Sequence, residues 1–215
     1  YRGAIKYELS STRFPNAPFK NYATTWDDVS KRINKSSSFG GELDKTGYFM
    51  DDLLKVIETS SDEYQRVSSI YNYIKSKVTW NEYYGKYTDK GVKKAYNDGI
   101  GNAAEINLIL TAMLRSAGLN ANPVLVSTKT NGIPLFPTLN GFNYVISMVE
   151  FTDNSYILLD ATEPYAVPNI LSPKALNWNG RKIEKDGTSS WVKLTPNKPS
   201  LESNIITLKI SDDNS

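Results

Sequence analysis

The hydrophobic pattern changes from a helical to a strand-like period at Gly118, a little past the middle of the chain. Before this point apolar residues recur three and four positions apart, which is the spacing of amphipathic helices. Thr25 is a suitable N-cap for the first helix, since Asp27 and Asp28 follow where the helix dipole favours anions. Further helices are predicted at 51–57, from a capping box at 60–63 to Val78, at 91–96 and at 102–117, with a loop over 79–87.

After Gly118 the alternation is typical of strands. The segment 161–190, which is rich in Pro and Asn/Gly, is predicted to be mostly loop, and 16–21 to be a linker. Helices followed by a meander of strands indicate an α+β fold, with the helix at 102–117 packed on an antiparallel sheet. The predicted strands are 123–128, 141–151 and 156–160 in the sheet, 191–194 and 205–210 later in the chain, and 1–9 at its start.

The helix at 102–117 has the clearest boundaries. Asn102 is an N-cap, Glu105 stands at the third helical position and Gly118 supplies the stop. Its residues are apolar nearly all round, which is typical of a helix in the middle of a domain. In a cysteine enzyme a thiolate would lie at such a helix start, where the dipole lowers its pKa. Here Ala103 and Ala104 occupy the first turn, as either a packing surface or the remnant of a lost nucleophile.

The chain contains no cysteine and no histidine. This excludes Cys–His and Ser–His–Asp sites, thiolate or imidazole metal sites and disulfides. No calcium-type loop is present, so neither a metal nor a cofactor is expected. The charge balance of 25 basic against 23 acidic side chains favours no nucleic-acid partner. The densest apolar run, 106–114, is far shorter than the roughly 20 residues of a membrane helix, so no membrane insertion is expected.

Two groups of side chains are candidates for chemistry or binding. Asp160 and Glu163 could form a carboxylate pair for hydrolysis of a glycoside, or could simply cap a turn and face solvent. The aromatic and amide segment 80–87 could recognise a sugar or a peptide, or its Trp80 could close the core over a helix end. The candidate ligand-binding residues are Trp80, Asn81, Tyr83, Tyr84 and Asn102.

Three stretches together resemble the transglutaminase-like superfamily, whose members share a papain-like fold. The segment 101–121 is similar to the family's Gly-Asp-Cys helix with its leucine-rich run and Arg-x-Ala-Gly ending. The strand 123–128 follows as in the family, and 142–146 with 158–162 resemble its His and Asp strands. Upstream Trp26–Val29 and downstream Trp191–Leu194 look like the bacterial proteins in which this core follows a β-rich domain called DUF3857.

The resemblance implies a triad of Cys, His and Asp, in which the thiolate attacks an amide and the imidazole carries the proton. In this sequence the three positions are Ala103, Tyr144 and Asp160. Alanine has no nucleophile, and a tyrosine with a pKa near 10 is a poor base at neutral pH. The resemblance therefore implies a catalytically inactive relative.

The expected domains are an edge strand and linker of a preceding β-rich domain (1–20), a transglutaminase-like domain (21–196), and the start of a following β-domain or a tail (197–215). The expected function is a binding or structural module of an exported bacterial multidomain protein, in the periplasm or at the cell surface, with a peptide or glycan in the vestigial cleft and neighbouring domains as partners. The alternatives are a hydrolase with relocated carboxylate chemistry and a purely architectural spacer whose cleft is plugged by Tyr144.

Overall fold

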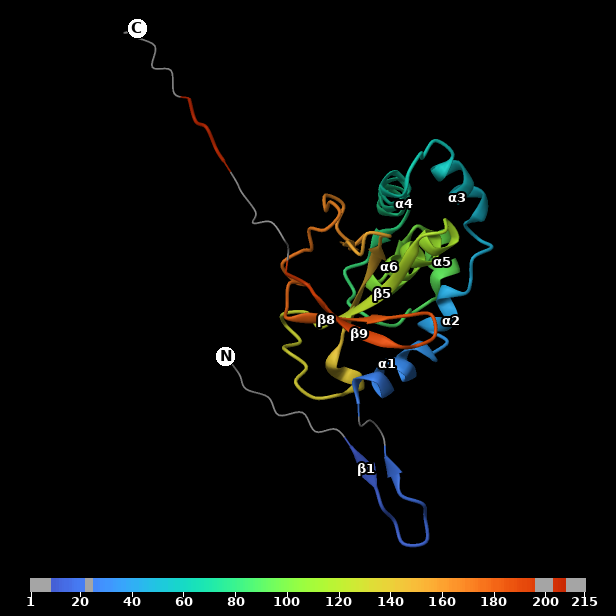
Figure 1. Ribbon diagram of the computed structural model, residues 1–215, viewed down its shortest axis with the longest axis vertical. Coiled ribbons are helices and arrows are strands. Elements are labelled where there is room, and N and C mark those ends of the chain that lie inside the picture. The colour runs from blue at the N-terminus through green and yellow to red at the C-terminus, as the bar shows by residue number, and fades with distance from the viewer. Residues whose placement is uncertain (1–8, 22–24, 196–202, 208–215) are drawn as a thin grey trace.

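The computed structural model describes residues 9–21, 25–195 and 203–207. A five-stranded, entirely antiparallel sheet forms its centre, in the order β7-β6-β5-β8-β9 (Figure 1). The expected α+β fold, with a helix packed on an antiparallel sheet, is confirmed. The strands are β5 (Asn120–Val126), β6 (Tyr144–Glu150), β7 (Tyr156–Leu159), β8 (Asn179–Ile183) and β9 (Ser189–Lys193).

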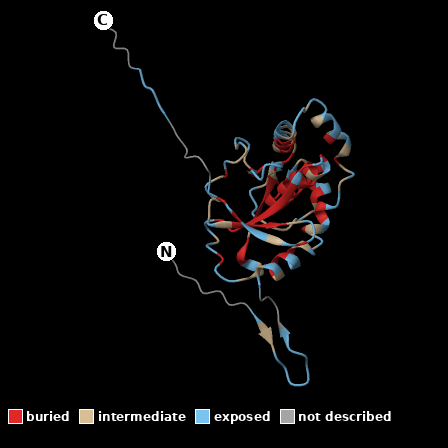
Figure 2. Ribbon diagram, in the orientation of Figure 1, coloured by how far each residue is buried: buried red, intermediate tan, exposed pale blue. Residues whose placement is uncertain are grey.

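Helix α6 (Ala103–Ser116) packs on β5 and β6, where the buried residues of Figure 2 concentrate. Asn102 caps it as predicted, because its side chain accepts from the Glu105 amide while the Glu105 carboxylate accepts from the Asn102 amide. Every residue from Ala103 to Leu114 is buried. An apolar circumference and a reciprocal cap thus place the start of this helix inside the domain.

Of the five helices that precede α6 in the described residues, three pack on it, one packs on another helix, and the first contacts β8 and β9. Thr25 caps the first, as predicted, by accepting from the Asp28 amide at 3.1 Å. The cap of α4 is Asp62 and not the predicted Ser60, because Asp62 accepts from the Gln65 amide while Gln65 reaches back to the Ser61 amide. The bounds are α1 (Trp26–Asn34), α2 (Gly40–Leu43), α3 (Met50–Ile57), α4 (Glu63–Lys77) and α5 (Val92–Asp98), and a short 3-10 helix, η1, spans Leu139–Gly141.

Two short strand pairings were not predicted, and each includes part of a segment predicted to be a loop or linker. β3 (Thr79–Trp80) pairs in parallel with β4 (Ile100–Gly101), so the segment 79–87 begins as a strand. This pairing anchors both ends of the segment that leads into α6. β1 (Ser11–Thr12) pairs with β2 (Lys20–Asn21), so the predicted linker 16–21 ends in a hairpin, which projects from the body in Figure 1.

Strand β8 was missed, because 161–190 was predicted to be mostly loop. It lies second from the sheet edge, yet its polar residues give no apolar alternation. Arg181 and Lys182 are only 6% and 9% exposed. Arg181 pairs with Asp27 at 2.7 Å, and Lys182 pairs with Glu150 at 2.8 Å. Burial of these charges is possible because carboxylates from other elements neutralise them.

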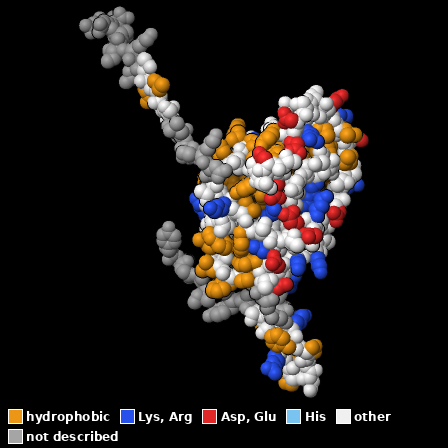
Figure 3. Space-filling view, viewed as in Figure 1, with side chains coloured by type: hydrophobic (Ala, Val, Ile, Leu, Met, Phe, Trp, Pro, Cys, Tyr) orange, Lys and Arg blue, Asp and Glu red, His pale blue; other side chains and the backbone are white. Residues whose placement is uncertain are grey.

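The predicted strand 205–210 is wrong for 205–207, which form no strand, and 208–210 lie outside the described residues. The predicted strand 1–9 lies outside them too, except for Leu9. No helix in the described ranges is long and apolar enough to cross a membrane. Acidic and basic side chains are interspersed on the helical side of the surface in Figure 3, whereas hydrophobic ones gather on the opposite side.

Asp52 joins three helices and makes the stability pH-dependent. Its Oδ2 accepts from the Tyr96 hydroxyl at 2.6 Å and the Tyr73 hydroxyl at 2.9 Å, and these bonds lower the pKa of Asp52 below 3.8. Because the pKa is lower in the folded state, this stabilisation is complete above about pH 4 and is lost as the pH falls.

The free energy of unfolding, measured in urea at pH 7 and pH 3, tests this role of Asp52. We expect it to decrease less between pH 7 and pH 3 for Asp52→Asn than for the wild type. The exposed neighbour Asp51 gives the control, since Asp51→Asn should lose stability as the wild type does; equal losses in all three proteins would contradict the prediction.

Candidate functional site

The structure brings Ala103, Tyr144 and Asp160 together. Ala103 opens α6, Tyr144 opens β6, and Asp160 follows the last residue of β7. The Tyr144 hydroxyl donates to Asp160 Oδ2 at 2.9 Å, and Ala103 packs in the same apolar cluster as Tyr144. Ala103 and Tyr144 are fully buried and Asp160 is 2% exposed. The three positions therefore form a closed contact inside the core.

The Asp160 carboxylate is held by neutral donors. Asn107 Nδ2 donates to its Oδ1 at 3.1 Å, and the Thr162 hydroxyl donates to the same oxygen at 2.9 Å. Asn107 is itself fully buried, and it also donates to the Val145 carbonyl and accepts from the Ala161 amide. These bonds satisfy the buried carboxyl group of Asp160 and link α6 to β6 and to the residues that follow β7.

The phenol of Tyr144 remains protonated. Burial raises the pKa of the Tyr144 hydroxyl far above its usual value, and the negative charge of Asp160 raises it further. A group with such a pKa donates a hydrogen bond but takes no proton from a substrate. With alanine at the helix start and tyrosine at position 144, the arrangement contains neither a thiolate nor an imidazole.

Lys174 covers this contact from the solvent side. Its ammonium lies 3.8 Å from the centre of the Trp80 ring and 5.4 Å from that of Tyr144. It also pairs with Glu163 at 2.6 Å, and its side chain is 15% exposed. Trp80, predicted to bind ligand, thus forms a wall for a lysine of its own chain, and Glu163 of the predicted carboxylate pair neutralises that lysine.

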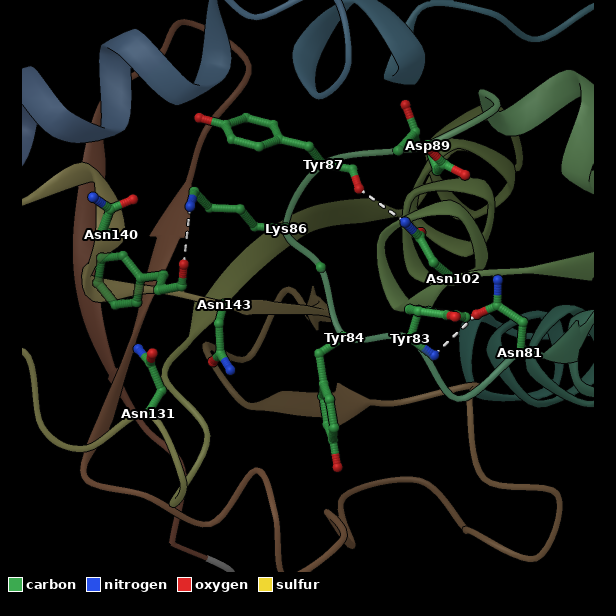
Figure 4. Close-up of a pocket in the computed structure, with 13 residues that line it drawn as sticks. Asn81, Tyr83, Tyr84, Lys86, Tyr87, Asp89, Asn102, Asn131, Asn140 and Asn143 are labelled. Atoms are coloured by element: carbon green, nitrogen blue, oxygen red, sulfur yellow. Dashed lines mark hydrogen bonds between the residues drawn. The ribbon is translucent and has the colours of Figure 1, made fainter. Parts of the chain in front are cut away.

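An open groove of about 1030 Å³ lies beside the buried triad positions (Figure 4). Tyr84 separates the two, because it lines the groove while its ring centre lies 5.7 Å from that of Tyr144. Trp80 does not line the groove. The lining residues are Asn81, Tyr83, Tyr84, Gly85, Lys86, Tyr87, Thr88, Asp89, Asn102, Asn131, Asn140, Phe142 and Asn143.

Glu105 holds one wall of the groove in place. Its Oε1 accepts from the backbone amides of Asp89, Lys90 and Gly91 at 3.1, 2.7 and 3.1 Å. Its Oε2 accepts from the Asn102 amide at 2.8 Å. A fully buried carboxylate thus fixes the loop and the helix cap together.

Of the predicted ligand-binding residues, Asn81, Tyr83, Tyr84 and Asn102 line this groove. Both polar side-chain atoms of Asn102 form hydrogen bonds within the protein. Its Oδ1 accepts from the Glu105 amide, and its Nδ2 donates to the Tyr87 carbonyl. The asparagines of the opposite wall, 131, 140 and 143, were missed because they precede β6 in a segment without a binding motif. Lys174 was missed as well, since nothing in its local sequence indicates an aromatic enclosure.

Comparison with solved structures shows a similar fold. A crystal structure from Parabacteroides distasonis, described as a "putative protease", is 15% identical and has a TM-score of 0.56. The similarity covers 89% of this chain and 36% of that one, so this chain spans about a third of that protein's length. A "putative cysteine protease" from Cytophaga hutchinsonii is 12% identical over 85% of this chain and 62% of that one, with a TM-score of 0.42. No curated protein matches the sequence.

The sequence model of the transglutaminase-like superfamily matches residues 52–161. This range covers slightly more than half of the chain, from α3 to the end of β7, and includes all three triad positions. The fold, the capped helix α6, strand β6 that begins at position 144 and strand β7 that ends just before position 160 agree with it. The chain therefore belongs to the transglutaminase-like superfamily.

Proposed function

We propose that this domain is a non-catalytic transglutaminase-like module that binds a ligand within a larger protein. The single observation that carries the proposal is the closed contact of Ala103, Tyr144 and Asp160. A family reaction at this place would need a thiolate and an imidazole, and the chain has neither residue type. In the serine protease subtilisin, loss of the nucleophile alone costs on the order of a million-fold in rate.

The proposed context is an exported bacterial multidomain protein, periplasmic or at the cell surface, of the DUF3857-containing type. Residues 1–20 would then belong to a preceding β-rich domain, 21–196 to the module, and 197–215 to a following domain or tail. The length of the Parabacteroides protein, of which this chain spans 36%, supports a larger parent. The open groove beside the buried triad is the proposed ligand site.

A cysteine placed at position 103 tests whether the former reaction centre is closed. The chain has no cysteine, so Ala103→Cys introduces a single thiol at a helix start, where the dipole favours the reactive thiolate. Because Ala103 is fully buried, we expect this thiol to react with Ellman's reagent at least about a hundredfold more slowly in the native protein than in urea. Adding Lys174→Ala to this variant should accelerate the reaction of the thiol in the native protein, because it removes the side chain that covers the buried contact.

The control is Ser68→Cys on the exposed face of α4, which should react fast in both conditions. Fast native labelling of Ala103→Cys would overturn the closed-centre argument. Turnover is measured separately, as hydrolysis or transamidation of glutaminyl peptides by the wild-type chain. Any turnover that Tyr144→Phe or Asp160→Asn abolishes would overturn the non-catalytic proposal itself.

A further inference from the structure

We infer that the groove binds a neutral oligosaccharide. This inference rests on the proposed binding role and adds the chemical class of the ligand. The groove offers amides and aromatic rings rather than charge (Figure 4). Lys86 and Asp89 are its two charged residues, of opposite sign, and the Lys86 ammonium donates to the Phe142 carbonyl at 3.0 Å.

The amides of the groove are fixed before any ligand arrives. Asn143 exchanges two hydrogen bonds with Thr128, each of 2.9 Å. Asn131 donates to the Ser127 hydroxyl at 3.0 Å, and Asn81 accepts from the Tyr83 amide at 3.1 Å. Held in this way, they lose little side-chain entropy on binding.

Each of these amides retains binding capacity. A carboxamide has two hydrogens and two lone pairs. Asn81 makes one internal bond, while Asn131 and Asn143 make two each, so part of every amide stays unused. In the described parts of the chain, no hydrogen bond reaches Asn81 Nδ2 or Asn131 Oδ1. A donor and an acceptor on opposite walls suit a hydroxyl-bearing ligand, because each hydroxyl both donates and accepts.

Tyr83 and Tyr84 supply the stacking surface. Tyr83 is 72% exposed, and Tyr84, whose ring also packs edge-on against Trp80, is 47% exposed. The face of an aromatic ring is electronegative and attracts the polarised C–H groups on the face of a sugar ring. The two rings and the fixed amides together match the mixed apolar and hydroxylated surface of an oligosaccharide.

A peptide fits the groove less well. One recurring mode of binding an extended peptide is through main-chain hydrogen bonds to the edge of a sheet. None of the lining residues belongs to a strand, so the groove presents no such edge. A charged peptide would also meet no cluster of opposite charge. The side-chain amides therefore favour a ligand recognised through hydroxyls.

Affinity electrophoresis of the whole chain tests this inference. We expect at least one of four neutral polysaccharides (xyloglucan, arabinoxylan, galactomannan, soluble starch) to slow the protein in native gels. Tyr83→Ala should weaken binding about tenfold or more, because it removes the more exposed ring. Asn81→Ala should also weaken it. Tyr165→Ala is the matched control, since Tyr165 is 95% exposed and lies outside the groove. Thermal melts verify that each variant is folded.

Two outcomes would overturn the inference, namely no retardation by any of the four polymers, or retardation that Tyr83→Ala leaves unchanged. Peptides of a tryptic serum-albumin digest distinguish this failure from failure of the proposed function. If those peptides bind in a Tyr83-dependent manner while no polysaccharide does, the inference fails and the binding module stands. If the wild-type chain depolymerises any of the polymers, the non-catalytic proposal fails.

Discussion

Replacement of Glu105 by alanine should destabilise the domain by about 4 kcal/mol, because each buried donor left unsatisfied costs about 1–3 kcal/mol. Glu105 is fully buried, and its carboxylate accepts from four backbone amides, those of Asp89, Lys90, Gly91 and Asn102. Without the Glu105 carboxylate, the capping box offers these four amides no other acceptor. Urea denaturation with a linear extrapolation measures the free energy of unfolding.

Glu58→Ala provides the matched control for this variant. Glu58 follows the last residue of α3 and is exposed, so its loss should change the free energy of unfolding by no more than about 0.5 kcal/mol. Glu105→Gln should fall between the two, because it retains one acceptor oxygen and places a donor against other donors. Equal stability of Glu105→Ala and Glu58→Ala would show that the four amides find solvent or other partners.

Asn107→Leu should cost about 3 kcal/mol although it keeps the volume and makes the helix more apolar. Asn107 donates to Asp160 and to the Val145 carbonyl and accepts from the Ala161 amide, all in the core. Leucine leaves three buried polar groups with fewer partners, and each loss costs about 1 kcal/mol or more. Thermal unfolding should show a decrease of about 6–12 °C in Tm, at about 2–4 °C per kcal/mol for a chain of this size.

The control for this change is Asn72→Leu, at an exposed position of α4 where the amide makes no such bonds. Its Tm should remain within about 2 °C of the wild type, since surface substitutions change stability little. A stable Asn107→Leu variant would mean that apolar packing, rather than the hydrogen bonds around Asp160, holds α6 to the sheet.

Elements with a simple apolar period could be predicted from the sequence. Helix α6 and strands β5 to β7 were found because burial selects apolar residues at a fixed spacing. Strand β8 was not found, because two of its buried residues are Arg181 and Lys182. Their partners Asp27 and Glu150 lie 154 and 32 residues away, so no local pattern indicates that these charges are neutralised.

Part of the candidate site could also be predicted from the sequence, and part could not. Positions 103, 144 and 160 could be chosen from the resemblance, and the structure places them together. The aromatic segment after β3 indicated one wall of the groove. The other wall could not be predicted, because hydrogen bonds to Ser127 and Thr128 position the side chains of Asn131 and Asn143. The same applies to Lys174, whose enclosure is formed by residues 30 to 94 positions earlier in the chain.

The buried hydroxyl of Tyr144 also constrains the evolutionary routes open to this sequence. Histidine at this position would remove the hydroxyl that contacts Asp160 and Thr162 and would replace a fully buried ring with a smaller one. A cavity and a lost hydrogen bond both cost stability. Cysteine at position 103 alone would gain a thiol without a base. Each first step toward a thiol–imidazole pair therefore costs stability or adds a thiol without a base, so such a pair would arise in this sequence only through coordinated substitutions.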